Sequence, residues 1–158
     1  MRWIRILILI PVFGLALLQQ ACSYLTDFVV VDRSSQPVEV RYKVKKHPGG
    51  FAPPVTPATI DISQLSAKGG QDWNPLVSTE YQIDEANWTV TVTLEPGKAL
   101  RLSTMHHYTG PEDPIDRDSF PIEEISLTGA NGATTLVGEQ ARVTFARESR
   151  VLYTLTYR

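Results

Sequence analysis

The chain has 158 residues, 42% of them hydrophobic, with a single cysteine and a formal net charge of −2. Two of its 15 basic residues lie at the extreme N-terminus, so 13 basic and 17 acidic residues remain after Arg5. This acidic excess argues against nucleic acid as a partner and against electrostatic docking on anionic lipid. A lone cysteine excludes an internal disulfide, so a hydrophobic core must stabilise the fold.

The N-terminal segment has the pattern of an export signal. Arg2 and Arg5 precede an unbroken apolar run at 6–18, and a small residue, Ala21, follows shortly after it. A charged start, an apolar core and a small residue at the exit are typical of a signal peptide. Thirteen helical residues reach only about 20 Å across a hydrocarbon core of about 30 Å, which is too short for a spanning helix. We therefore expect export, with residues 1–21 as the signal peptide.

The exit of this segment contains the only cysteine. Cys22 directly follows Ala21. The stretch Met1–Cys22 resembles the N-terminus of bacterial lipoproteins, in which a cysteine preceded by alanine or glycine is lipidated and becomes the mature N-terminus. The family pattern prefers leucine three residues before the cysteine and a small residue two before it, where this chain has Gln19 and Gln20. The match to this lipobox is therefore partial.

The resemblance implies a lipid anchor on Cys22. Residues 22–27 would then form the attachment and a short tether of at most about 18 Å, holding the domain close to a membrane. Serine at position 23, rather than aspartate, would favour the outer membrane of a source that has one, with the protein facing the periplasm. Ordinary cleavage after Ala21, giving a soluble secreted or periplasmic protein, and an uncleaved anchor remain open alternatives.

Residues 28–158 predict a single all-β domain, because short runs of alternating apolar and polar residues are separated by turn signals. The clearest run is 38–45, in which Val38, Val40, Tyr42 and Val44 alternate with charged residues. About eight or nine such strands predict an antiparallel β-sandwich, immunoglobulin-like or transthyretin-like, with a small closed barrel as the alternative. The predicted strands lie near residues 28–31, 38–45, 60–65, 88–94, 99–105, 125–127, 134–137, 141–145 and 151–157.

Three further predictions concern turns and local period. The turn 95–98, with its Pro-Gly pair, predicts that 88–94 and 99–105 form a hairpin. Alternation of Ala141, Val143 and Phe145 favours a strand, although a helical turn could begin at Glu139. The Asn131-Gly132 pair predicts a tight turn between two further strands.

Two polar stretches are candidates for a binding or catalytic site. His47–Thr59 holds four prolines and two glycines and predicts an extended surface loop, serving as a strand crossover or a recognition segment. His106–Glu124 is rich in acidic residues, but Asp113, Asp116 and Asp118 lack the spacing and the central glycine of a calcium loop. We therefore expect a solvated acidic loop and predict no catalytic residue, no cofactor and no metal site.

Two classes of function remain. The first is a non-enzymatic, membrane-tethered interaction or accessory module of the cell envelope, whose loops or strand edge bind a protein partner. The second is a glycan- or small-molecule-binding domain that uses exposed aromatic side chains. The candidates are Trp73, which we expect over an open end of the core, Trp88, which we expect inside it, Tyr81 and Tyr108. The basic stripe Arg41, Lys43, Lys45 and Lys46 predicts a solvated strand face rather than a contact surface.

Overall fold

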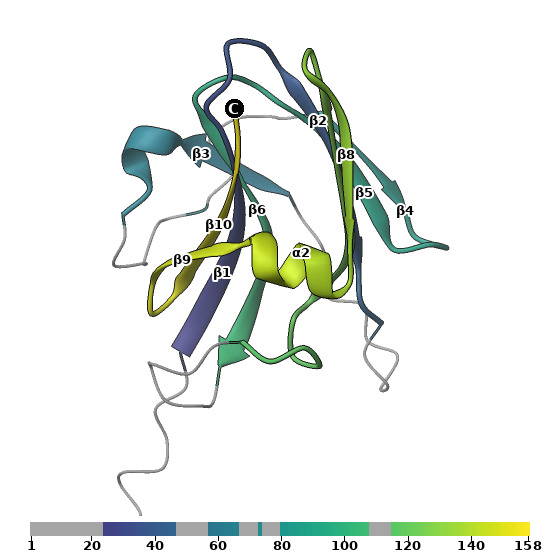
Figure 1. Cartoon of the computed structure of the whole chain (residues 1–158), viewed down its shortest axis with the longest axis vertical. Helices are drawn as coiled ribbons and strands as arrows, with labels where there is room; N and C mark the ends of the chain where they lie inside the picture. The colour runs from purple at the N-terminus through teal and green to yellow at the C-terminus, as the bar shows by residue number, and fades with distance from the viewer. Residues whose placement is uncertain (1–23, 47–56, 67–72, 74–79, 108–114) are drawn as a thin grey trace, which may run out of the picture.

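The structure is a computed structural model that describes residues 24–46, 57–66, 73, 80–107 and 115–158. It is an all-β sandwich of two five-stranded sheets, which confirms the predicted fold class (Figure 1). The elements are β1 (Tyr24–Asp32), β2 (Val38–Val44), β3 (Ala58–Asp61), the 3-10 turn η1 (Ile62–Gln64), β4 (Tyr81–Asp84), β5 (Thr89–Leu94), β6 (Lys98–His107), β7 (Ile122–Gly129), β8 (Gly132–Val137), the helix α2 (Glu139–Thr144), β9 (Ala146–Ser149) and β10 (Leu152–Tyr157).

The first sheet has the order β3-β6-β1-β10-β9, and the second has the order β4-β5-β2-β7-β8. Neighbouring strands are antiparallel except for β1 and β10, which pair in parallel with Val30 opposite Leu155. The first and last strands of the domain therefore lie side by side within one sheet.

β1 is buried on both of its faces. Phe28 and Val30 lie in the main core between the sheets, whereas Val29 and Val31 lie in a second apolar cluster on the outer face of the first sheet. An unbroken apolar run is typical of a strand covered on both sides. Trp73 belongs to this second cluster and is only 6% exposed. The expectation that it covers an open end of the main core is therefore wrong.

The main core contains an aromatic group built around β1. The ring of Phe28 lies 5.2 Å from that of Phe120 in an edge-to-face arrangement and 5.3 Å from that of Tyr153 in a stacked one. Phe145 adds a further edge-to-face contact with Phe28 at 5.8 Å. Such pairs add to the free energy gained by burying their apolar area. The alternating residues predicted to face inward on β2 are all buried here.

The predicted hairpin of 88–94 with 99–105 is wrong. β5 pairs with β4 and β2 in the second sheet, whereas β6 pairs with β1 and β3 in the first. The turn itself is as predicted, with Gly97 at φ 75° and the Lys98 N–H donating to the Glu95 carbonyl at 3.1 Å. Both strands direct alternate apolar residues into the same core, so a connection between sheets satisfies the sequence pattern as well as a hairpin does.

The predicted strand at 141–145 is also wrong, because residues 139–144 form the helix α2. Ala141 and Phe145 are buried while Val143 is 63% exposed. A spacing of four places two residues on one face of a helix and also on one face of a strand, so these two positions could not distinguish the periods. Gly138, at φ 55°, ends β8 and allows the chain to turn into the helix.

The structure adds two strands that the sequence did not predict, β4 and β9, and it starts the first strand at Tyr24 instead of Phe28. Trp88 is also placed differently from the prediction. It precedes β5, has a φ of 57° and is only partly buried, so it is not a core residue.

Candidate interaction site

Cys22 lies outside the described residues. Only Ser23 separates it in sequence from β1, which begins at Tyr24 beside His107 at the end of β6. The C-terminus lies at the opposite end of the sandwich, at the top of Figure 1. None of the helices in the described part of the chain is long and apolar enough to cross a membrane.

The basic stripe of β2 interacts largely with the chain itself. Lys43 forms an ion pair with Glu123 at 2.9 Å, and the Lys45 ammonium donates to the Arg117 carbonyl at 2.7 Å. Lys46 lies over the ring of Trp88, 5.3 Å from its centroid. Three of the four cations therefore contact other parts of the chain, while Arg41 is exposed.

The described part of the acidic stretch is structural. The Asp116 carboxylate accepts hydrogen bonds from the Ser119 main-chain N–H at 2.8 Å and from the Ser119 hydroxyl at 2.9 Å, which fixes a turn. Ile115 and Phe120, on either side of this turn, are buried in the core. Asp113 and Tyr108 lie outside the described residues. Within residues 115–158 and the other described ranges, no group of three or more His, Cys, Asp or Glu could hold a metal ion.

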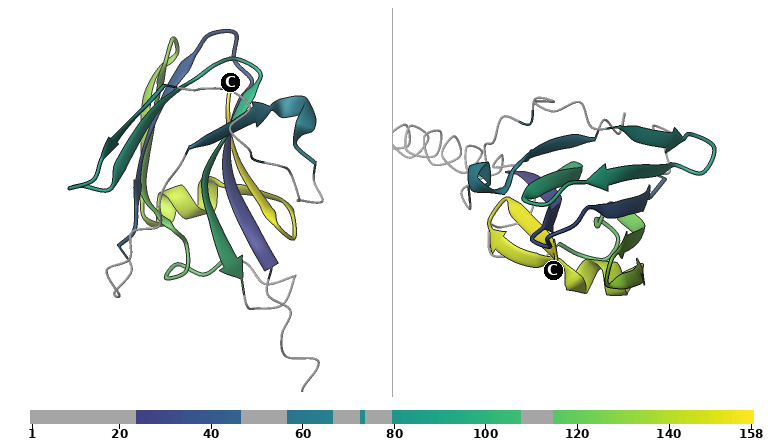
Figure 2. Two further views of the ribbon diagram at one scale, coloured as in Figure 1. Left: turned by 180° about the vertical axis from the view of Figure 1, so that it is seen from behind. Right: turned by 90° about the horizontal axis from the view of Figure 1, so that it is seen from above.

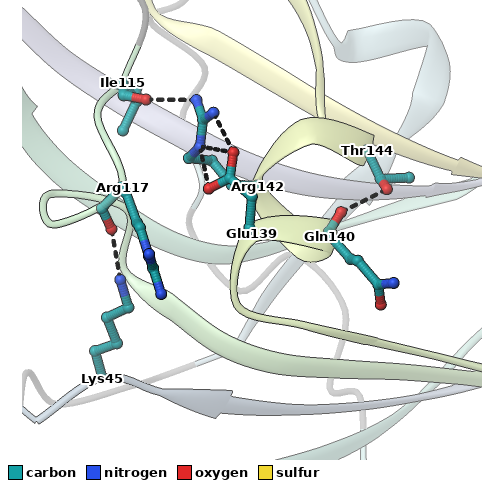
Figure 3. Close-up of polar contacts among 7 residues, drawn as sticks. All are labelled: Lys45, Ile115, Arg117, Glu139, Gln140, Arg142 and Thr144. Atoms are coloured by element: carbon teal, nitrogen blue, oxygen red, sulfur yellow. Dashed lines mark hydrogen bonds and ion pairs between the residues drawn. The ribbon is translucent and has the colours of Figure 1, made fainter.

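The connection from β8 through α2 to β9 closes one side of the sandwich (Figures 1 and 2). Ala141 and Phe145 enter the core from this segment. Arg142 donates to the Ile115 carbonyl at 3.0 Å and to the Glu139 carboxylate, so the helix is fixed to the turn beneath it (Figure 3). The hydrogen bond from Arg142 holds the pKa of Glu139 below its ordinary value.

The space between the sheets also contains polar atoms. Burial raises the pKa of the Tyr42 hydroxyl above its usual range. Asp32 is fully buried, and one of its carboxylate oxygens accepts from the Ser34 N–H at 2.8 Å. Five buried side-chain atoms have no hydrogen-bond partner among the described residues: Thr26 Oγ1, Asp32 Oδ2, Tyr42 OH, Tyr153 OH and Tyr157 OH.

At the margin opposite α2, the outermost strand is β4. Side chains on the core-facing side of β4 are exposed to solvent. Tyr81 pairs with Val92 and Ile83 pairs with Val90, so these side chains lie on the face that turns toward the core. Both valines are about 1% exposed, whereas Tyr81 and Ile83 are each 46% exposed. The β4–β5 turn points away from the first sheet (Figures 1 and 2). The apolar face of the second sheet therefore continues past the core into solvent.

The other face of β4 is polar and acidic. A shallow cavity of about 400 Å³ lies there, lined by Glu39, Glu80, Tyr81, Gln82, Thr91 and Thr93. Asp84 ends the strand and accepts hydrogen bonds from the main-chain N–H and the side-chain amide of Asn87 at 3.2 and 2.8 Å. These hydrogen bonds hold the pKa of the Asp84 carboxyl below its ordinary value.

Sequence reasoning named Tyr81 as a candidate but missed the strand that carries it. The only signal was the alternation of Tyr81 and Ile83 with Gln82 and Asp84, which is too short to predict a strand. Of the other proposed aromatic residues, Trp73 is buried, with its indole N–H donating to Asp27 at 3.1 Å.

The chain was also compared with known proteins. No family model matches it, and neither a curated protein nor a solved structure has significant similarity to it.

Proposed function

We propose that this chain is a non-enzymatic interaction or accessory module of the cell envelope, tethered to the membrane by a lipid on Cys22. The observation that carries the proposal is the margin formed by β4, where apolar side chains on the core-facing side of an outermost strand are half exposed. Among the described residues no strand pairs with the outer edge of β4. A sheet edge of this kind, with an adjoining apolar surface, is suited to binding another protein.

The anchor is supported by the lipobox resemblance at Met1–Cys22 and by the start of the first strand. With β1 beginning at Tyr24, a single residue would separate a lipidated cysteine from the body of the domain. One extended residue spans about 3.5 Å, so the end of the sandwich near Tyr24 would face the membrane closely. The proposed location is the outer membrane, facing the periplasm. The opposite end and the β4 margin would then remain open to envelope proteins.

A ligand-binding role would require aromatic side chains gathered in a concavity. Trp73 packs into the second apolar cluster, and Trp88 is partly covered by Lys46. Tyr81 lies on a sheet margin, next to a cavity lined mainly by acidic and polar groups. This arrangement suits a protein partner better than a sugar ring or an apolar small molecule.

Photo-crosslinking in intact cells tests the proposal. A photoreactive phenylalanine analogue replaces Tyr81 on β4 or, as a matched control, Val137 on the outermost strand β8, which is 52% exposed. We expect a protein adduct at position 81 in the membrane fraction, no such adduct at position 137, and loss of the adduct when Cys22→Ser is added. No adduct at position 81, or equal adducts at both positions, would contradict the proposed role.

A further inference from the structure

We propose that the free edge of β4 binds an extended segment of a partner protein in which apolar residues alternate with lysine or arginine, added to the second sheet as a sixth strand. This inference rests on the proposed role as an interaction module and defines the chemistry of the partner. Three features of β4 support this inference: its main chain, its core-facing side and its outer side.

The main chain of β4 offers a template for pairing. β4 is the outermost strand of its sheet, so half of its N–H and C=O groups point away from β5. The strand is held in place on its inner side by a register of four residue pairs with β5. The hydrogen bonds between Asp84 and Asn87 fix the turn that joins the two strands. A partner strand would therefore meet a preformed edge and lose little free energy to ordering it.

The core-facing side of β4 calls for apolar residues in the partner. Tyr81 and Ile83 are two residues apart and project on the same side as the buried Val90 and Val92. An added strand would place alternate residues beside them on this side, because directly opposed side chains in a sheet lie about 5 Å apart. Apolar residues there would bury surface that is now 46% exposed on each side chain.

The outer side of β4 calls for basic residues. Glu80 and Asp84 flank Gln82 on this side. The one basic residue that acts on Asp84 is Arg41 of β2, which lies two strands away on the same face. Glu39 of β2 lines the same cavity as Glu80. Lysine or arginine at the alternate positions of the partner would face this acidic surface. A second copy of β4 is disfavoured, because it would bring the same acidic stretches together.

The other outermost strands lack this combination. β8 contains no charged residue, and Asp61 of β3 already pairs with Lys98. β9 carries adjacent charges of both signs, Arg147 and Glu148. Only β4, among the edges that the structure describes, joins an exposed apolar inner side to an outer side whose own charged residues are all acidic.

A binding experiment with defined peptides tests the inference. The full chain, purified from membranes in a non-ionic detergent, is titrated into a fluorescent Val-Lys-Val-Lys-Val-Lys-Val peptide, and fluorescence anisotropy is recorded. The matched peptide replaces every lysine with glutamate. The variants are Ile83→Lys and Glu80→Lys on β4, with Val137→Lys on β8 as the control. All three positions are exposed, and thermal unfolding checks that each variant is folded.

We expect the lysine peptide to bind, and its affinity to fall about tenfold in Ile83→Lys and Glu80→Lys, to remain unchanged in Val137→Lys, and to weaken as salt is added. The glutamate peptide should not bind. Hydrogen exchange should show protection at alternate amides of β4 when the peptide is bound.

Absence of binding, equal loss in Val137→Lys, or a chain that dimerises through β4 would overturn the inference. The experiment also separates this inference from the proposed role. If the crosslinking in cells captures a partner at position 81 but the peptide does not bind, the chain is an interaction module whose partner has different chemistry.

Discussion

The turn that follows β4, the proposed binding edge, is fixed by two residues, Asp84 and Asn87. Asn87 donates twice to the Asp84 carboxylate, once from its main-chain N–H and once from its side-chain amide. This is a local turn motif in which an aspartate side chain replaces a main-chain acceptor. The same contacts shift the pKa of Asp84 downward, and the hydrogen bond from the Asn87 side chain is the largest cause.

The first prediction concerns the pH dependence of this turn. The folded-state pKa of Asp84 lies below its unfolded value of about 3.9, so the hydrogen bonds stabilise the fold above that value. The stabilisation is lost as the pH falls through the lower, folded-state pKa. In Asn87→Ala, the side-chain donor is removed, and we expect the Asp84 pKa to rise toward its ordinary value. NMR titration of the Asp84 carboxyl carbon measures this pKa in the wild type and in Asn87→Ala. An unchanged pKa in the variant would show that the Asn87 side chain does not cause the shift.

The second prediction concerns a close approach between the two sheets at the end of β7. A Cβ atom added at Gly129 would contact the hydroxyl of Tyr157 and lie 3.0 Å from the ring carbon that carries it. We expect Gly129→Ala to lower the free energy of unfolding by about 1–3 kcal/mol, because the tyrosine must move. Tyr157→Phe removes a buried hydroxyl that has no hydrogen-bond partner in the described residues.

The double variant provides the control for this contact. Urea unfolding of Gly129→Ala with Tyr157→Phe should recover much of the loss, because the nearest atom is gone. If the two effects simply add, the close contact with Tyr157 is not the cause of the destabilisation.

Among the elements, α2 shows how one short segment closes a side of the sandwich. The helix has only six residues and would not be stable alone, so its place depends on the residues it buries and on its link to the turn at Ile115. Phe145 directly follows the helix and joins the aromatic group, with its ring 5.7 Å from that of Phe120.

The third prediction separates the helix from the strand that the sequence suggested. In a strand, Val143 and Phe145 would share one face, and truncating either would cost stability. In the helix, Phe145→Ala should lower the free energy of unfolding by about 3–5 kcal/mol, whereas Val143→Ala should change it by less than about 0.5 kcal/mol. Denaturant unfolding measures both, and comparable losses would contradict the helical assignment.

The elements that the sequence predicted well are those with a long, unambiguous pattern. β2 alternates over all seven of its residues, and β10 is a strongly apolar run. The turn at Gly97 was also predicted from its Pro-Gly pair. β4 and β9 have four residues each, mostly exposed, so tertiary pairing rather than a periodic pattern defines them. The candidate interaction site was missed for this reason, because it lies on one of these short strands.

At the scale of the whole molecule, a sandwich was predictable from the number of strands, but the assignment of strands to sheets was not. Alternation shows which residues face a core and leaves open which sheet contributes them. β5 and β6 belong to opposite sheets, and the parallel pairing of β1 with β10 joins residues that are far apart in sequence. The apolar run in β1 is buried on both faces because the second cluster covers the outer face of the first sheet.

The proposed anchor determines which surfaces of the molecule can meet a partner. A lipid on Cys22 would hold the end near Tyr24 at the membrane and leave the β4 margin exposed to envelope proteins. A soluble chain would instead be free to bind in any orientation.

The intact mass of the mature protein from cells, measured for the wild type beside Cys22→Ser, tests this most directly. We predict a wild-type mass equal to a chain that begins at Cys22 plus a lipid adduct, and loss of that adduct in the variant. An unmodified chain cut at another position, or an uncut chain, would contradict the tethered module proposed for this protein.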